Sequence, residues 1–185
     1  MYYSGNYYLT QSEMEVNAAY IVNYFLPKGW TLNAICGMLG NMRYESTINP
    51  GIWQNLNPNN PNLGYGLVQW TPSTNFIDWC NSRGLSITSM DSALMRIEFE
   101  LENGLQFYPS STYDMTFREF KVSEENPSLL GDIFLKNYER PEVQNQPHRG
   151  ENALWWYQYF SGYVPPNPQP TKSKKFKWWL YLRQI

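Results

Sequence analysis

The chain has 185 residues, of which 42% are hydrophobic and 17% aromatic, so a packed fold is expected rather than disorder. Residues 164–185 contain five basic residues and no acid, which leaves nine Lys and Arg against 16 acidic residues in the rest of the chain. Such an acidic body lacks the basic face that binds phosphates, and this argues against a nucleic-acid partner.

The sequence gives no reason to expect a metal ion or an organic cofactor. His148 is the single histidine and has no Cys or His at a metal-ligand spacing. Cys36 and Cys80 are expected to be free, buried thiols rather than a pair. The N-terminus shows no secretory signal and no apolar run reaches the roughly 20 residues that cross a bilayer, so an extracellular substrate would require another means of delivery.

Two helices are predicted in the N-terminal part of the chain. Thr10 and Glu13 have the spacing of a capping box, and apolar residues then follow at helical spacing up to the break at 27–29. A second helix is predicted from near Thr31, and it must end before the Asn-Pro-Gly sequence at 49–51. Glu45 falls on its last turn.

The segment after the second helix predicts a small β-wing. Residues 52–62 are rich in Asn and Pro and lack hydrophobic periodicity, whereas residues 64–70 have the pattern of a short, glycine-flanked strand. Thr71 and Pro72 are then expected to start a helix that stops at 83–84.

Helices dominate the remainder of the body. The expected starts and stops are Ser89 to Gly104, a short helix opened by Thr116 to Glu119, Asn126 to the break at Pro141, and Pro147 to Phe160. We therefore expect an α+β fold that is predominantly helical, with the small β-wing inserted after the second helix.

The C-terminal residues differ in composition from the body. The Pro-rich stretch 164–170 is typical of an extended spacer, which divides the chain into a domain at 1–163 and a tail at 164–185. In residues 172–185 basic side chains alternate with Trp, Tyr and Leu. This pattern suits either a membrane surface or docking onto a partner protein, and the sequence favours neither.

Glu45 is the strongest catalytic candidate. It lies three residues after Met42 and seven after Met38, so it continues the apolar face of the second helix. A carboxyl group in this place loses hydration, which we expect to raise its pKa and keep it protonated as a general acid. The alternatives are a Glu that pairs with a base such as Arg43, or one that faces water.

The motifs around Glu45 resemble those of known enzymes. The segments 41–50 and 64–70 are similar to the catalytic core of lysozymes and lytic transglycosylases, in which a Glu-Ser helix end faces a Gly-x-Gly-Leu-x-Gln strand across a cleft. A closer resemblance, over roughly Leu9 to Phe160, is to the phage tail lysozyme family. The segments that carry it are Ala34–Met42, Glu45–Gly51, Gly66–Pro72 and Tyr138–Pro141.

The resemblance implies a lysozyme-like fold, a peptidoglycan substrate and roles for six residues. Glu45 would be the proton donor, and Tyr65 and Gln69 would line the cleft. Weaker candidates for substrate binding are Ser46, Tyr138 and Glu139. The alternatives are cross-strand pairing for Tyr65 and Gln69, and a salt bridge from Glu139 to Arg140 or Arg149.

A missing carboxylate limits the mechanism. No Asp or Glu lies between Glu45 and Asp78, so the wing cannot supply the second carboxylate of a retaining lysozyme. An inverting hydrolase would use a water positioned by Gln69 or by a distant carboxylate, and a lytic transglycosylase would use the substrate's own 6-hydroxyl. The resemblance favours hydrolysis of the β-1,4 bond between N-acetylmuramic acid and N-acetylglucosamine.

The biological role has three alternatives, of which the first is an enzyme that acts at the cell wall. Such an enzyme could act from a virion tail or as an endolysin released from the host cytoplasm, and the acidic body mildly favours the virion. A non-catalytic glycan-binding module is the main hypothesis of another class. A structural tail component that docks phage tail proteins through residues 172–185 is the third.

Overall fold

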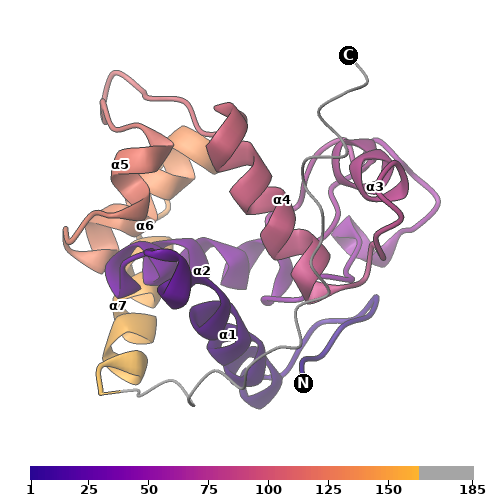
Figure 1. The fold of residues 1–185 in the computed structure, drawn as a ribbon, viewed down its shortest axis with the longest axis horizontal. Coiled ribbons are helices and arrows are strands. Elements are labelled where there is room, and N and C mark those ends of the chain that lie inside the picture. The colour runs from indigo at the N-terminus through magenta and orange to yellow at the C-terminus, as the bar shows by residue number, and fades with distance from the viewer. Residues whose placement is uncertain (163–185) are drawn as a thin grey trace.

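The computed structural model describes residues 1–162, and the predicted tail at 164–185 lies outside them (Figure 1). The described part is predominantly helical, as expected. Its α-helices are α1 Gln11–Phe25, α2 Leu32–Ser46, α3 Thr74–Asn81, α4 Met90–Asn103, α5 Phe117–Lys121, α6 Pro127–Phe134 and α7 Pro147–Phe160. Shorter turns are the 3-10 segments η1 Leu26–Lys28 and η2 Gln54–Leu56, and the π-helical turn η3 Leu135–Glu139.

Local capping explains where most helices begin and end. Thr10 caps α1 and Thr116 caps α5, each in a complete capping box with the Glu three residues later, as predicted. Gly104 ends α4 in the left-handed conformation that glycine adopts without steric cost. Only α3 begins later than expected, at Thr74.

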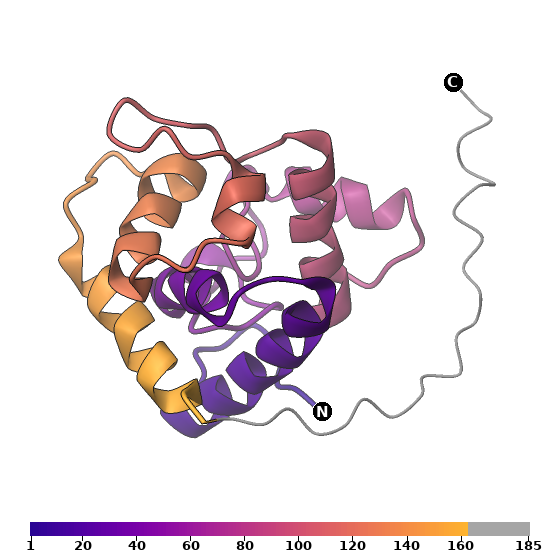
Figure 2. The same ribbon diagram turned by 60° about the vertical axis from the view of Figure 1, so that its left-hand side comes forward.

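The second helix forms the centre of the molecule. Residues 33–42 of α2 are buried on every side of the helix, rather than along the single stripe that the sequence suggested. Figure 2 shows α2 near the middle of the fold, with the other long helices around it. Because α2 is enclosed on several sides, a polar side chain at its exposed C-terminal end is held on a rigid support.

Glycines allow α2, α6 and α7 to pack closely. A Cβ at Gly40 would lie 2.4 Å from the carbonyl oxygen of Arg149 and 2.8 Å from the amide nitrogen of Ala153. Gly37 also lies close to α6, where a Cβ would be 2.9 Å from the Cβ of Leu130. The backbones of α6 and α7 therefore approach α2 more closely than bulkier residues would permit.

The predicted strand at 64–70 is not present in the described residues. Tyr65 forms isolated bridges to Trp53 and Trp70, and the chain between Tyr65 and Trp70 reverses in a tight turn. Gly66 and Gln69 have φ values of 80° and 48°, which interrupt an extended backbone. The β-wing is therefore a loop of turns and bridges, and the α+β class is corrected to a predominantly helical fold with almost no strand in the described residues.

The expectation for the two cysteines is confirmed within the described part. Cys36 and Cys80 are free and buried. None of the helices in residues 1–162 is long and apolar enough to cross a membrane.

Candidate active site

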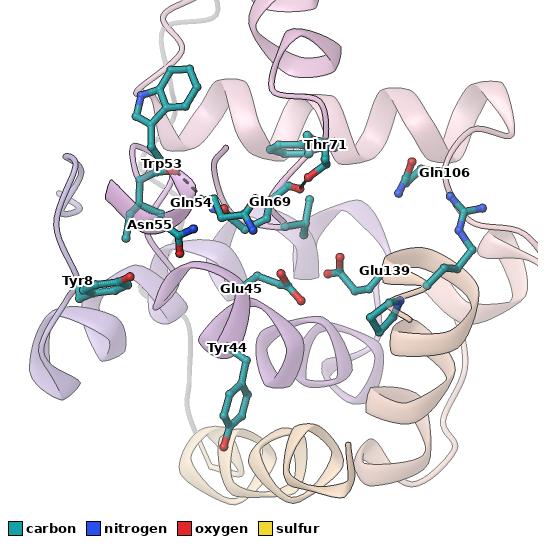
Figure 3. Close-up of a pocket in the computed structure, with 15 residues that line it drawn as sticks. Tyr8, Tyr44, Glu45, Trp53, Gln54, Asn55, Gln69, Thr71, Gln106 and Glu139 are labelled. Carbon is teal, nitrogen blue, oxygen red and sulfur yellow. Dashed lines mark hydrogen bonds between the residues drawn. The ribbon is translucent and has the colours of Figure 1, made fainter. Parts of the chain in front are cut away.

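A cavity of about 520 Å³ opens beside the C-terminal end of α2 (Figure 3). Glu45, Glu139 and Arg140 contribute charged groups, and the wing loop contributes amide, hydroxyl and indole groups. The complete lining is Tyr8, Tyr44, Glu45, Ile52, Trp53, Gln54, Asn55, Val68, Gln69, Trp70, Thr71, Gln106, Glu139, Arg140 and Pro141. Mixed polar and aromatic groups of this kind can hydrogen-bond hydroxyls and stack on the flat faces of a sugar.

Glu45 lies on this cavity, as predicted. Its side chain is 19% exposed, so the expected loss of hydration is only partial. Its carboxylate Oε1 accepts a hydrogen bond from Nη1 of Arg149 at 2.5 Å. The expected alternative partner, Arg43, instead lies over the ring of Trp155. Glu45 thus pairs with Arg149 of α7 and remains open to a ligand.

Arg149 is a site residue that the sequence analysis did not assign to Glu45. It is 7% exposed, and Nη1 also lies 3.3 Å from Oδ1 of Asn41, while Nε donates to Oε1 of Gln146 at 2.8 Å. A guanidinium held by three acceptors has a fixed plane, so it fixes the orientation of the Glu45 carboxylate. No local pattern marks Arg149, because its contact with Glu45 spans 104 residues.

Glu139 is the second carboxyl group of the cavity. It ends the π-helical turn η3, a kind of irregularity that is frequent at functional sites. Burial raises its pKa well above the ordinary value, the negative charge of Glu45 adds to this, and Arg149 opposes it. The salt bridge expected with Arg140 or Arg149 is not among those formed within residues 1–162.

Ser46 and Tyr65 do not reach the cavity. Ser46 is 1% exposed, and its hydroxyl donates to the carbonyls of Met42 and Leu67 at 3.0 and 2.8 Å. Tyr65 is equally buried and its hydroxyl donates to the carbonyl of Ile87 at 3.2 Å. Ser46 ties the wing loop to the end of α2, and Tyr65 ties it to the loop between α3 and α4, so neither side chain lines the cavity as predicted.

Gln69 lines the cavity, as predicted, and lies across it from Glu45 in Figure 3. Its Nε2 donates to the carbonyls of Gly66 and Ile52 at 3.0 and 3.4 Å. Its Oε1 is buried and has no hydrogen-bond partner among the described residues. This amide oxygen is therefore an acceptor that a ligand could satisfy.

Tyr138 belongs to a buried network beneath the cavity. Its hydroxyl donates to Glu100 Oε2 at 2.5 Å, while Trp70 Nε1 and Arg96 Nε donate to Oε1 at 2.9 and 2.8 Å. Burial raises the pKa of Glu100, and these three donors oppose the rise. Tyr138 therefore supports the cavity wall from behind, rather than forming its surface as predicted.

Comparison with known sequences identifies the family. A model of the phage tail lysozyme family matches residues 16–160, which include both cavity carboxyl groups. The chain belongs to this family. The resemblance seen in its motifs is therefore confirmed.

A similar individual protein adds context. Morphogenesis protein 1 of Bacillus phage B103 is 54% identical over 162 residues. The matched stretch covers 88% of this chain and 44% of that protein, so the chain spans less than half the length of this relative.

Proposed function

We propose that the protein cleaves the glycan strand of peptidoglycan at the β-1,4 bond between N-acetylmuramic acid and N-acetylglucosamine, with Glu45 as the proton donor. The observation that carries this proposal is the position of Glu45, oriented by Arg149 on the wall of the polar and aromatic cavity. Family membership supports the same chemistry.

The reaction requires a proton on the glycosidic oxygen as its bond to C1 breaks. Glu45 would supply this proton, and the positive charge that develops at C1 would lie close to the carboxylate left behind. Water would then add to C1. Gln69 and Gln54, on the wing side of the cavity, would bind the sugar through hydrogen bonds.

The relative's name supports a phage particle as the setting of this activity. A morphogenesis protein takes part in assembling the phage, so we propose that the present chain acts at the cell wall from a virion. The division into a domain at 1–163 and a tail at 164–185, in which the tail contacts other phage proteins or a membrane surface, remains part of the same proposal.

The test compares wild type with Glu45→Gln on purified bacterial cell walls. We expect clearing by wild type and a loss of at least about 10²-fold in the variant, because Gln keeps the shape of Glu but carries no transferable proton. Binding to walls without clearing by either protein would instead identify a non-catalytic glycan-binding module.

Mass spectrometry of the released fragments defines the bond that is broken and the route. We expect reducing N-acetylmuramic acid ends, which a hydrolase produces. Anhydro-muramic ends would show that the 6-hydroxyl of the substrate attacks, and the protein would then be a lytic transglycosylase.

A further inference from the structure

Two carboxyl groups share the cavity although the wing loop supplies neither. Glu45 comes from the last turn of α2, and Glu139 comes from the end of η3. Figure 3 shows the two carboxyl groups pointing toward one another along the same wall. A second acidic group is therefore present at the place where the proposed chemistry occurs.

The two groups have unequal partners. Glu45 is ion-paired with the buried guanidinium of Arg149. The Oε1 atom of Glu139 is buried and has no hydrogen-bond partner among residues 1–162. Among the described residues, no Lys or Arg nitrogen lies at ion-pair distance from the Glu139 carboxyl group. Glu45 thus has a cationic partner, whereas the surroundings of Glu139 favour its protonated form.

We infer that Glu45 and Glu139 act as a single acid, which holds one proton between the two carboxyl groups and gives it to the glycosidic oxygen. The inference rests on the proposed function and adds Glu139 to it as a second catalytic group. Two carboxyl groups that share a site resist simultaneous ionisation, which is the physical reason for a shared proton.

The two carboxyl groups lose one proton during the reaction and regain one at its end. The proton passes from Glu139 through Glu45 to the glycosidic oxygen, which keeps the electron pair of the breaking bond to C1. A water oxygen then bonds to C1, and the proton that the water loses returns to the pair. While both carboxyl groups are ionised, Arg149 and Arg140 provide two compensating positive charges near them.

The charged groups around Glu139 come from several elements. Glu45 on α2 and Glu100 on α4 raise its pKa, in addition to the dominant effect of burial. Arg149 on α7 and the adjacent Arg140 lower it, and the neighbouring Tyr138 hydroxyl is bonded to Glu100 rather than to Glu139. Together these effects raise the pKa of Glu139, so it holds its proton at a pH where an ordinary Glu has lost it.

The first test is the pH profile of wall clearing for wild type, Glu139→Gln and Glu139→Asp. Loss of the second carboxyl group should move the alkaline limb of the profile to lower pH by about 1–3 units, the usual effect of one neighbouring charge. Clearing by Glu139→Gln should then fall at least tenfold at pH 7 and recover toward pH 5. Glu139→Asp, which retains a carboxyl group, should lie closer to wild type.

Glu142→Gln is the matched control, because Glu142 is exposed near the cavity but does not line it. Its profile should match that of wild type. A loss in Glu139→Gln by the same factor at every pH would indicate a structural role and overturn the inference, and so would an unchanged profile.

The second test does not depend on turnover. Carboxyl carbons of ¹³C-labelled Glu can be titrated by NMR in wild type and in Glu45→Gln. Glu139 should keep its proton well above the ordinary range in wild type, and should lose it at lower pH in Glu45→Gln because the neighbouring charge is gone. If the titration of Glu139 were the same in both proteins, the shared proton would be disproved even when wild type clears walls. If Glu45→Gln cleared walls normally while the titrations were coupled, the proposed function would fail instead.

Discussion

Arg149 contributes geometry as well as charge to the site. Its guanidinium contacts Glu45, Asn41 and Gln146 at once, which a lysine ammonium on a flexible chain cannot reproduce. We therefore expect Arg149→Lys to clear walls about 10²-fold more slowly, since a small displacement of a catalytic group has an effect of that size. The measurement is the initial rate of clearing, with thermal unfolding followed by circular dichroism to show that the fold persists.

The control for this prediction is Arg43→Lys. Arg43 lies on α2 beside Glu45 but contacts Trp155 and does not line the cavity. Its replacement should leave the clearing rate unchanged. An equal loss of clearing rate in Arg149→Lys and Arg43→Lys would show that the Glu45–Arg149 contact has no specific role in catalysis.

The proton on Glu139 also predicts how stability depends on pH. Burial raises the pKa of this group above its ordinary value of about 4.5, so the folded state binds a proton more tightly than the unfolded state does. The stabilisation is fully present below about pH 4.5 and is lost as pH rises through the raised pKa. Glu139→Gln removes this dependence, so its free energy of unfolding relative to wild type should increase from pH 4.5 to pH 7.5.

Urea unfolding of both proteins at several pH values measures this difference. Glu142→Gln, whose side chain is exposed, should differ from wild type by the same amount at every pH. A pH-independent difference for Glu139→Gln would contradict the assignment of a raised pKa.

At the scale of elements, the close approach of α7 to α2 depends on Gly40. A methyl group there would overlap the backbone of Arg149 and Ala153, which cannot rotate away as a side chain can. Gly40→Ala should therefore lower the free energy of unfolding by about 1–3 kcal/mol and displace Arg149 from Glu45. Urea unfolding and the clearing rate measure the two effects.

Glu151→Ala is the comparison for Gly40→Ala. Glu151 lies on α7, but its side chain is exposed. The free energy of unfolding should change by no more than about 0.5 kcal/mol. If Gly40→Ala were as mild, the close packing of the two helices would not be needed for stability.

Helix boundaries were predictable because their signals are local. The capping boxes at Thr10 and Thr116 and the stop at Gly104 need only neighbouring residues, and each is confirmed. The turn at 66–69 was not predictable, because its positive φ values accompany contacts with distant residues, such as the bond from Ser46 to Leu67. The same holds for Arg149, which reaches Glu45 only after α7 has packed on α2.

The whole molecule carries an uneven charge. Outside residues 164–185 the acids outnumber Lys and Arg by 16 to nine, whereas those last residues are only basic. Cell walls are anionic, so the acidic body should be repelled at low salt. We expect the clearing rate to rise about two- to tenfold between roughly 10 and 150 mM NaCl, as the screening length falls from about 30 to 8 Å.

A variant with the basic residues of 172–185 changed to Gln provides the comparison. It should respond more steeply to salt, because nothing then offsets the repulsion of the body. A rate that falls with salt in wild type would show instead that the basic residues dominate the encounter with the wall.

The Glu100 network has a consequence for the shape of the substrate. Trp70 follows Gln69 on one rim of the cavity and Tyr138 precedes Glu139 on the other, and both donate to a single carboxyl group on α4. The Glu100 carboxyl group therefore sets the distance between the two rims. The cavity cannot widen unless one of these two buried hydrogen bonds breaks. The glycan strand of the proposed reaction would have to fit this spacing, and any bending needed to reach Glu45 would fall on the sugar rather than on the protein.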